Sequence, residues 1–81
     1  MGNKLHFDAA SLFDFYGAFI ERYNDRFHIR KYYDTDGKDV SFEFYSVPNE
    51  DKINYIKELA ATLGGKAVFS DDKMKFDIYE I

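Results

Sequence analysis

The chain has 81 residues, enough for one compact domain spanning residues 1–81 and too few for two. Its residues are 46% hydrophobic and 20% aromatic, which excludes a disordered chain, and a formal net charge of −4 argues against direct binding of nucleic-acid backbones. The absence of cysteine excludes a disulfide framework, a thiolate nucleophile and a Cys-ligated zinc. The absence of cysteine also fits a reducing compartment. No apolar run approaches the ~18 residues of a membrane span, so we expect a cytoplasmic protein that does not contact the membrane.

The first predicted elements are a short strand and an aromatic helix. Residues 4–7 alternate polar and apolar side chains, which predicts the strand, and either Asp8 or Ser11 can cap the helix that follows. Ser11 with Asp14 approximates a capping box. Within residues 12–23 the apolar positions recur at helical spacing, at about 100° per residue, on an arc roughly 160° wide. We expect this whole arc to be buried: Leu12, Phe13, Phe15, Tyr16, Phe19, Ile20 and Tyr23.

A hairpin follows the first helix. Residues 27–33 and 40–46 both alternate apolar and polar side chains, as strands with one buried face do. The turn chemistry at residues 34–38, which contains an Asp-Gly pair, joins them. Pro48 ends the second strand because proline cannot donate to a ladder.

The second half of the chain repeats this order of elements. Asn49 can cap a second helix whose first turn is acidic and which ends at Gly64 and Gly65. Residues 66–70 predict a short strand, Asp71 and Asp72 a turn, and residues 74–81 a last strand.

The element order therefore predicts an α+β two-layer sandwich. Its antiparallel sheet has four or five strands and carries two helices on one face, in the order (β)αββαββ. If residues 4–7 form a full strand, right-handed crossovers would give a ferredoxin-like sheet. Without that strand the same layers remain, with a different strand order.

The sequence shows no motif for catalysis, metal binding or a cofactor. The two histidines, His6 and His28, lack the spacings of zinc sites, and both are expected on the solvated side of strands. Residues 34–45 fail the ligand spacing of a calcium-binding EF-hand loop. We therefore expect no catalytic residues, no bound metal and no cofactor.

Three tyrosines are candidates for binding a partner. Tyr32, Tyr45 and Tyr79 are expected to point away from the helices, with Arg30 and Glu43 among their neighbours. Tyrosine with charged surroundings is typical of protein interfaces. Aromatic side chains on an open sheet also occur in RNA-recognition domains, but the aromatic RNA-binding segment of those domains is missing here. The remaining alternative is that tyrosine is simply a good strand residue.

Acidic residues gather at one end of the predicted topology. They lie at the end of the first helix, at the start of the second and in the last turn: Asp25, Glu50, Asp51, Asp71 and Asp72. Such an acidic rim could steer a basic partner, although acidic turns also serve solubility alone.

These features predict a small acidic protein that is not an enzyme and binds another protein as an inhibitor or adaptor. It resembles small phage and immunity proteins in size and charge only, and its expected partner is a basic or nucleic-acid-handling protein. One alternative is self-association, such as a homodimer, through the tyrosine face or an edge strand at residues 74–81. The other is an enzyme or small-ligand domain with a pocket between helix and sheet.

Overall fold

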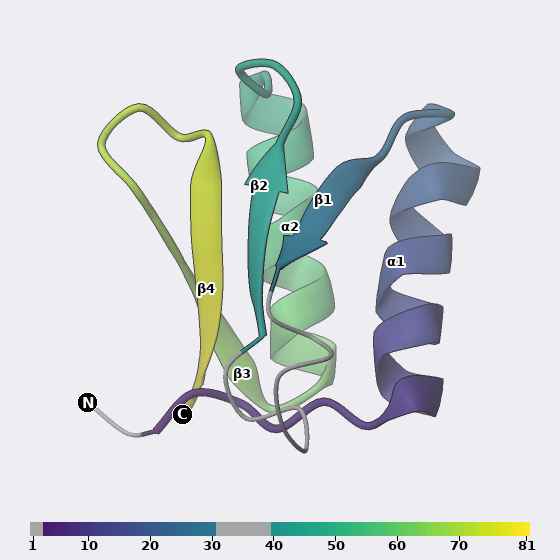
Figure 1. Cartoon of the computed structure of the whole chain (residues 1–81), viewed down its shortest axis with the longest axis vertical. Coiled ribbons are helices and arrows are strands. Elements are labelled where there is room, and N and C mark those ends of the chain that lie inside the picture. The colour runs from purple at the N-terminus through teal and green to yellow at the C-terminus, as the bar shows by residue number, and fades with distance from the viewer. Residues whose placement is uncertain (1–2, 31–39) are drawn as a thin grey trace.

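The computed structural model describes residues 3–30 and 40–81. In chain order its elements are α1 (Ala9–Tyr23), β1 (Phe27–Arg30), β2 (Ser41–Phe44), α2 (Glu50–Thr62), β3 (Gly65–Phe69) and β4 (Lys75–Glu80). The predicted order of helices and hairpin strands is confirmed for these residues (Figure 1). The predicted turn at residues 34–38 lies outside the described residues.

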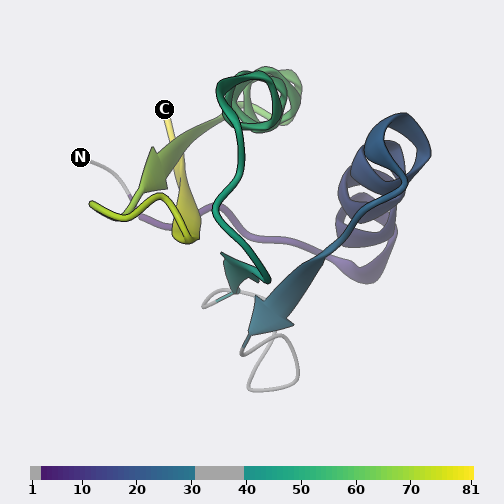
Figure 2. The same cartoon turned by 90° about the horizontal axis from the view of Figure 1, so that it is seen from above.

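The four strands form one sheet in the order β1-β2-β4-β3, and all neighbouring strands are antiparallel. Both helices lie on one face of this curved sheet, which confirms the two-layer α+β architecture (Figure 2). Because β4 lies between β2 and β3 and is antiparallel to both, β2 and β3 run parallel on either side of it. The unit β2–α2–β3 is therefore a split βαβ motif.

The ferredoxin-like alternative is not found. It needs residues 4–7 as a complete strand, and in the structure this segment makes only one antiparallel bridge, between Lys4 and Tyr79 of β4. Two backbone hydrogen bonds accompany the bridge, from Leu5 N to the Ile78 carbonyl at 2.8 Å and from Glu80 N to the Asn3 carbonyl at 2.8 Å. The segment then leaves the sheet, because Phe7 turns into the core, where it is 2% exposed.

Of the two predicted caps of helix α1, Asp8 is the one the structure uses; its capping box is formed by Asp8 and Ser11, not by Ser11 and Asp14. Ser11 N donates to Asp8 Oδ1 at 2.8 Å, and Asp8 N donates to Ser11 Oγ at 3.2 Å. The hydrogen bond from the Ser11 amide lowers the pKa of the Asp8 carboxyl. At the other end, Asn24 adopts a left-handed conformation (φ 52°) and closes the helix.

The buried side of α1 is narrower than the sequence predicts. Leu12, Phe15 and Phe19 are buried, and Tyr16 and Tyr23 are half-buried, but Phe13 is 75% and Ile20 37% exposed. The last two lie at one border of the predicted arc, on the side of α1 away from the α2 contact. The sheet ends at β1 and α2 packs on the other side of α1, so nothing in the described part of the chain covers this border.

The core is built mainly from phenylalanine rings that the helices and strands bring together. Phe27 of β1 is 1% exposed and lies at the centre of this cluster. Its ring centroid lies between 5.0 and 5.9 Å from six others, those of Phe15, Tyr16, Phe19, Phe42, Phe44 and Phe76. Helix α2 adds Ile56 and Ala60, both fully buried. The rings are largely tilted or edge-to-face, the arrangements aromatic pairs prefer.

A polar cluster joins the two helices at the acidic end of the molecule. The Tyr23 hydroxyl donates to Asp51 Oδ2 at 2.5 Å, and the Arg22 guanidinium lies over the Tyr55 ring with 4.5 Å between Cζ and the ring centroid. Desolvation, together with the hydrogen bond to the Asp51 carboxylate, raises the pKa of Tyr23. The Arg22 cation–π contact and the Tyr23 hydrogen bond fix how α1 and α2 pack.

Two adjacent glycines connect α2 to β3 for different reasons. Gly64 has φ 78°, which confirms the predicted left-handed end of the helix. Gly65 is buried, and a Cβ atom there would lie 2.7 Å from Ile78 Cγ2 and 3.1 Å from the Tyr79 carbonyl oxygen. Only glycine fits against β4 and Leu5 at this position.

Gly65→Ala is therefore expected to lower the free energy of unfolding by about 1–3 kcal/mol, the usual range for overpacking a core. Gly17→Ala is the matched control, since a Cβ at Gly17 meets nothing within 4 Å. The control should be more stable than the unmodified protein by up to about 1 kcal/mol, the difference in helix propensity. Urea unfolding measures both, and a Gly65→Ala protein as stable as the original would show that the contact with β4 is wrong.

Candidate functional site

The face of the sheet that the helices leave uncovered is the candidate functional site (Figure 2). On each strand, buried residues alternate with exposed or half-buried ones, and the second set points away from the helices. We call this surface the open face. Its residues are His28, Arg30, Ser41, Glu43, Lys66, Val68, Lys75, Asp77 and Tyr79, with Tyr45, which follows β2 and lies against His28, at its border.

The predicted tyrosines do not form one patch. Tyr45 directly follows β2, is 65% exposed, and its ring lies edge-on to that of His28 with centroids 6.4 Å apart. Tyr79 lies on β4, half-buried and opposite Lys66 of β3. The pairing of Phe42 with Phe76 places these two tyrosines six residues apart along the strands, or roughly 20 Å. Tyr32 lies outside the described residues.

The structure pairs the other two predicted residues of this surface with each other. Arg30 Nη1 lies 2.7 Å from Glu43 Oε1 across the β1–β2 ladder. Glu43 also lies opposite His28 of β1 and Lys75 of β4 in the strand register. The Glu43 carboxylate therefore stands between cationic or titratable side chains on both neighbouring strands.

The described residues of the open face have the opposite net charge to the chain as a whole. Among residues 3–30 and 40–81, four cations lie on it or at its border, Lys4, Arg30, Lys66 and Lys75, against the two carboxylates Glu43 and Asp77. The whole chain has a formal net charge of −4. The described part of this face therefore has a local excess of positive charge.

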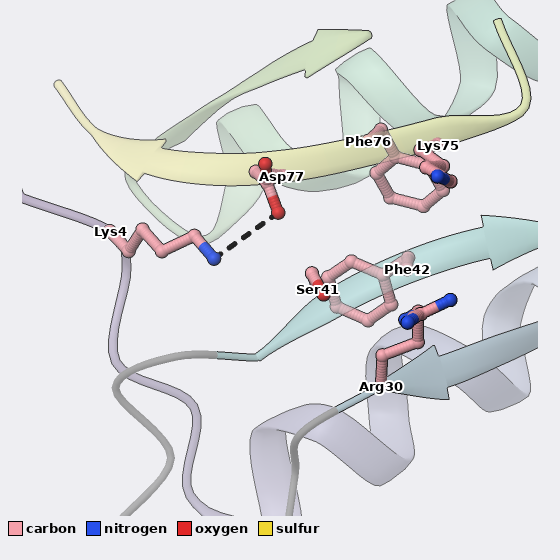
Figure 3. Close-up of a pocket in the computed structure, with 7 residues that line it drawn as sticks. All are labelled: Lys4, Arg30, Ser41, Phe42, Lys75, Phe76 and Asp77. Carbon is pink, nitrogen blue, oxygen red and sulfur yellow. Dashed lines mark ion pairs between the residues drawn. The ribbon is translucent and has the colours of Figure 1, made fainter. Parts of the chain in front are cut away.

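A hollow of about 280 Å³ opens in this face between β2 and β4 (Figure 3). The ladder pairs Phe42 with Phe76 and Glu43 with Lys75, and Phe44 N donates to the Met74 carbonyl at 2.7 Å; in the other direction, toward Ser41 and Asp77, the two strands separate. The rings of Phe42 and Phe76, stacked with centroids 4.8 Å apart, close its floor. The polar lining comes from four segments: Lys4 of the N-terminal segment, Arg30 of β1, Ser41 of β2, and Lys75 and Asp77 of β4.

The hollow can hold a carboxylate or another anion. Lys4 Nζ lies 3.3 Å from Asp77 Oδ1, and the side chains of Lys4 and Arg30 remain 24% and 46% exposed. Ion pairs with this much exposure contribute at most about 1 kcal/mol each, so they can exchange partners at little cost. An incoming carboxylate could therefore take the place of Asp77 or Glu43 beside these cations, while the Ser41 hydroxyl offers a further hydrogen bond.

The predicted acidic rim is largely occupied by contacts within the protein. The C-terminus of α1 and the β3–β4 turn lie on the same side of the molecule as the start of α2 (Figure 1). Asp25 accepts from Lys52 Nζ at 2.6 Å, Asp51 from Tyr23, and Asp72 from Ser70 Oγ at 2.7 Å. Within residues 3–30 and 40–81, no hydrogen bond or ion pair involves the side chains of Glu50 and Asp71.

Sequence reasoning missed two contributors to this surface: Lys4 and Lys66. Lys66 could have been found, because it precedes the buried Ala67 and must point the opposite way on the strand. Lys4 could not, because its place depends on a single bridge to a strand at the far end of the chain. The hollow itself depends on where β2 and β4 separate, which no local pattern indicates.

Both histidines are exposed, and nothing groups them into a metal site. Across residues 3–30 and 40–81, no cluster of three or more His, Asp or Glu side chains could hold a metal ion. In the same ranges no helix has the length and apolar character needed to cross a membrane.

Comparison of the chain with protein-family models, curated proteins and solved structures gives no match.

The Asp25–Lys52 pair predicts how stability depends on pH. The hydrogen bond from Lys52 and that from the Arg26 amide lower the pKa of Asp25 below its ordinary value of 3.8. A carboxyl with a lowered pKa in the folded state contributes stability that is complete above pH 3.8 and is lost as the pH falls below that value. Lys52→Met should therefore lower the free energy of unfolding near neutral pH by at most about 1 kcal/mol and make its decline in acid shallower.

Chemical denaturation across an acidic pH series measures this difference. Lys57→Met is the control, because Lys57 lies on the solvated side of α2. If Lys52→Met and Lys57→Met follow the same pH curve, the pair with Asp25 makes no contribution.

Proposed function

We propose that the protein is a binding domain, of the adaptor or inhibitor type, that docks another protein on the open face of its sheet. The observation that carries this proposal is an uncovered sheet face whose exposed side chains include Tyr45, His28 and Arg30 beside exchangeable ion pairs. Tyrosine and arginine are enriched in protein interfaces and account for many of their strongest contacts. Strand side chains also offer a rigid platform, which lowers the entropy cost of binding.

The charge of this face favours a partner segment that carries carboxylates. Lys4, Arg30 and Lys75 surround the hollow, and a partner carboxylate seated there would be held by charge-assisted hydrogen bonds. The sequence predicts a basic partner from the acidic rim, but Asp25, Asp51 and Asp72 are already bound within the protein. The open face therefore supports an acidic docking segment better than the rim supports a basic one.

Self-association remains an alternative, with one correction. The strand predicted at residues 74–81 is not an edge, because β4 pairs with both β2 and β3. The edges of the sheet are β1 and β3, so pairing between copies through a strand would use one of these. Two expectations stay predictions. One is that the domain has no catalytic activity, and the other is that it resides in the cytoplasm, which the absence of cysteine favours.

The experiment compares what the immobilised protein and its open-face variants retain from lysate, quantified by mass spectrometry. Arg30→Glu reverses a charge beside the hollow, and Tyr45→Ser removes an exposed ring; neither residue is buried. Each change should reduce retention of the specific partner by at least tenfold, because truncating an interface hot spot costs about 2 kcal/mol or more. Retention should also fall as salt is raised, because these exposed charges are screened.

Asn54→Ala and Glu58→Ala, on the solvated side of α2, are the matched controls. A partner retained equally by the original protein and the Arg30→Glu and Tyr45→Ser variants would remove the open face as the binding site. Light scattering over a concentration series measures the oligomeric state and so tests the self-association alternative. If the original protein is a dimer and the Tyr45→Ser variant is a monomer, the open face serves self-association and the partner proposal is wrong.

A further inference from the structure

We infer that α1 carries a second docking surface, which binds a basic amphipathic helix of another protein. The surface is the apolar stripe that the core leaves uncovered: Phe13, Gly17 and Ile20, with Asn24 at its end. These residues follow one another at spacings of four, three and four, so they lie along one line of the helix. The open face is on the other side of the sheet, so this inference does not depend on the function proposed above.

The stripe is exposed at Phe13, Ile20 and Asn24 and half-buried at Gly17. The Phe13 side chain is 75% exposed, the largest exposed fraction of any aromatic side chain in the described part, and Ile20 is 37% exposed. A Cβ atom on Gly17 would meet nothing within 4 Å. Glycine in the middle of a helix lowers its stability by up to about 1 kcal/mol relative to alanine, and here no contact with residues 3–30 or 40–81 requires it. A close approach by another backbone would use this gap between two large apolar side chains.

A hollow of about 360 Å³ continues the stripe at the end of α1. The described residues that line it are Ile20, Asn24, Asp25 and Arg26. The stripe thus offers a projecting ring at Phe13, a gap at Gly17 and a recess beyond Ile20. A helix with apolar side chains on one face could place one of them in the gap and another in the recess.

The charges beside the stripe decide which helix fits. Asp14 and Glu21 each follow a stripe residue by one position, so both carboxylates lie on the same flank, and both are exposed. The one basic residue of α1 is Arg22, which is turned toward α2, where its guanidinium lies over the Tyr55 ring. A partner helix with lysines or arginines along one flank would therefore complement α1, and an acidic one would be repelled.

The same charges argue against a second copy as the occupant. A two-fold antiparallel pair of α1 helices would bring Asp14 and Glu21 of one copy beside the same two residues of the other. In a two-fold parallel pair these carboxylates would face the flank that carries Tyr16, where α1 itself has no cation and Arg26 comes only after the helix, twelve positions beyond Asp14. Neither arrangement neutralises both carboxylates, so a different, basic chain fits better.

The test uses two synthetic helical peptides with the same leucine face, one flanked by lysines and the other by glutamates. Binding to the full chain is followed by fluorescence anisotropy, and the surface used is located from amide chemical-shift changes. The lysine peptide should bind at least tenfold more tightly than the glutamate peptide, with the largest shifts along α1. Equal binding of both peptides, no binding of either, or shifts confined to the sheet would overturn the inference.

Gly17→Gln separates binding from folding. The longer side chain fills the gap but enters open space, and glutamine is a better helix former than glycine. The variant should be at least as stable as the original protein while binding the lysine peptide at least tenfold more weakly. Unchanged binding would show that the gap is not used.

A pair of charge-reversed proteins tests specificity. Asp14→Lys with Glu21→Lys should reverse the preference between the two peptides. Glu58→Lys with Asp71→Lys makes the same change in net charge elsewhere on the surface and should keep the lysine peptide preferred. The same effect from both pairs would mean that only net charge matters, and binding to anionic lipid vesicles in place of the lysine peptide would mean that a membrane is the occupant. If the protein alone forms concentration-dependent dimers in which Phe13 is buried, the stripe binds a second copy.

Discussion

The ring of Phe27 is the contact on which the arrangement of the other elements depends. It lies on an edge strand, yet it is 1% exposed because rings from α1, β2 and β4 enclose it. Removing a buried phenylalanine side chain costs about 3–5 kcal/mol. At about 0.05–0.15 kcal/mol per residue, a domain of 81 residues has a total stability of only about 4–12 kcal/mol, so this one ring is comparable with the whole. Few single side chains could matter as much to a fold of this size.

A core of this kind is necessarily one-sided. Both helices are needed on the same face to enclose the rings, which leaves the other face of the sheet without a cover (Figure 2). Side chains therefore alternate along the strands. Phe42 and Phe76 point into the core, and Glu43, Lys75 and Asp77 point to solvent. The uncovered open face and the exposed stripe of α1 are thus two consequences of how one small core is closed.

Sequence patterns predicted the parts of the structure that depend on local rules. Asn49 caps α2, Gly64 ends it, and the burial of Phe27, Phe42 and Phe44 follows strand alternation. The errors come from tertiary contacts. β4 takes the place that residues 4–7 would occupy in a ferredoxin-like sheet, and the sheet is too narrow to cover Phe13.

The candidate surfaces show the same division. The outward direction of Arg30 and Glu43 follows from periodicity, but their ion pair depends on the β1–β2 register. The distance between Tyr45 and Tyr79 likewise depends on the β2–β4 register. The rim carboxylates could be placed at one end of the molecule by topology, yet their contacts with Lys52 and Tyr23 required the packing of α1 on α2. Local rules therefore locate charged side chains, and long-range packing decides whether they are available to a partner.

Nuclear Overhauser contacts of the Phe27 ring test this account most directly. We predict contacts from its ring protons to those of Phe15, Phe19 and Phe76, and none to Phe13 or Tyr45, which lie outside the core. Contacts from Phe27 to Phe13 or Tyr45, with those to Phe19 and Phe76 absent, would mean that the helices cover the opposite face. Both proposed docking surfaces would then be buried.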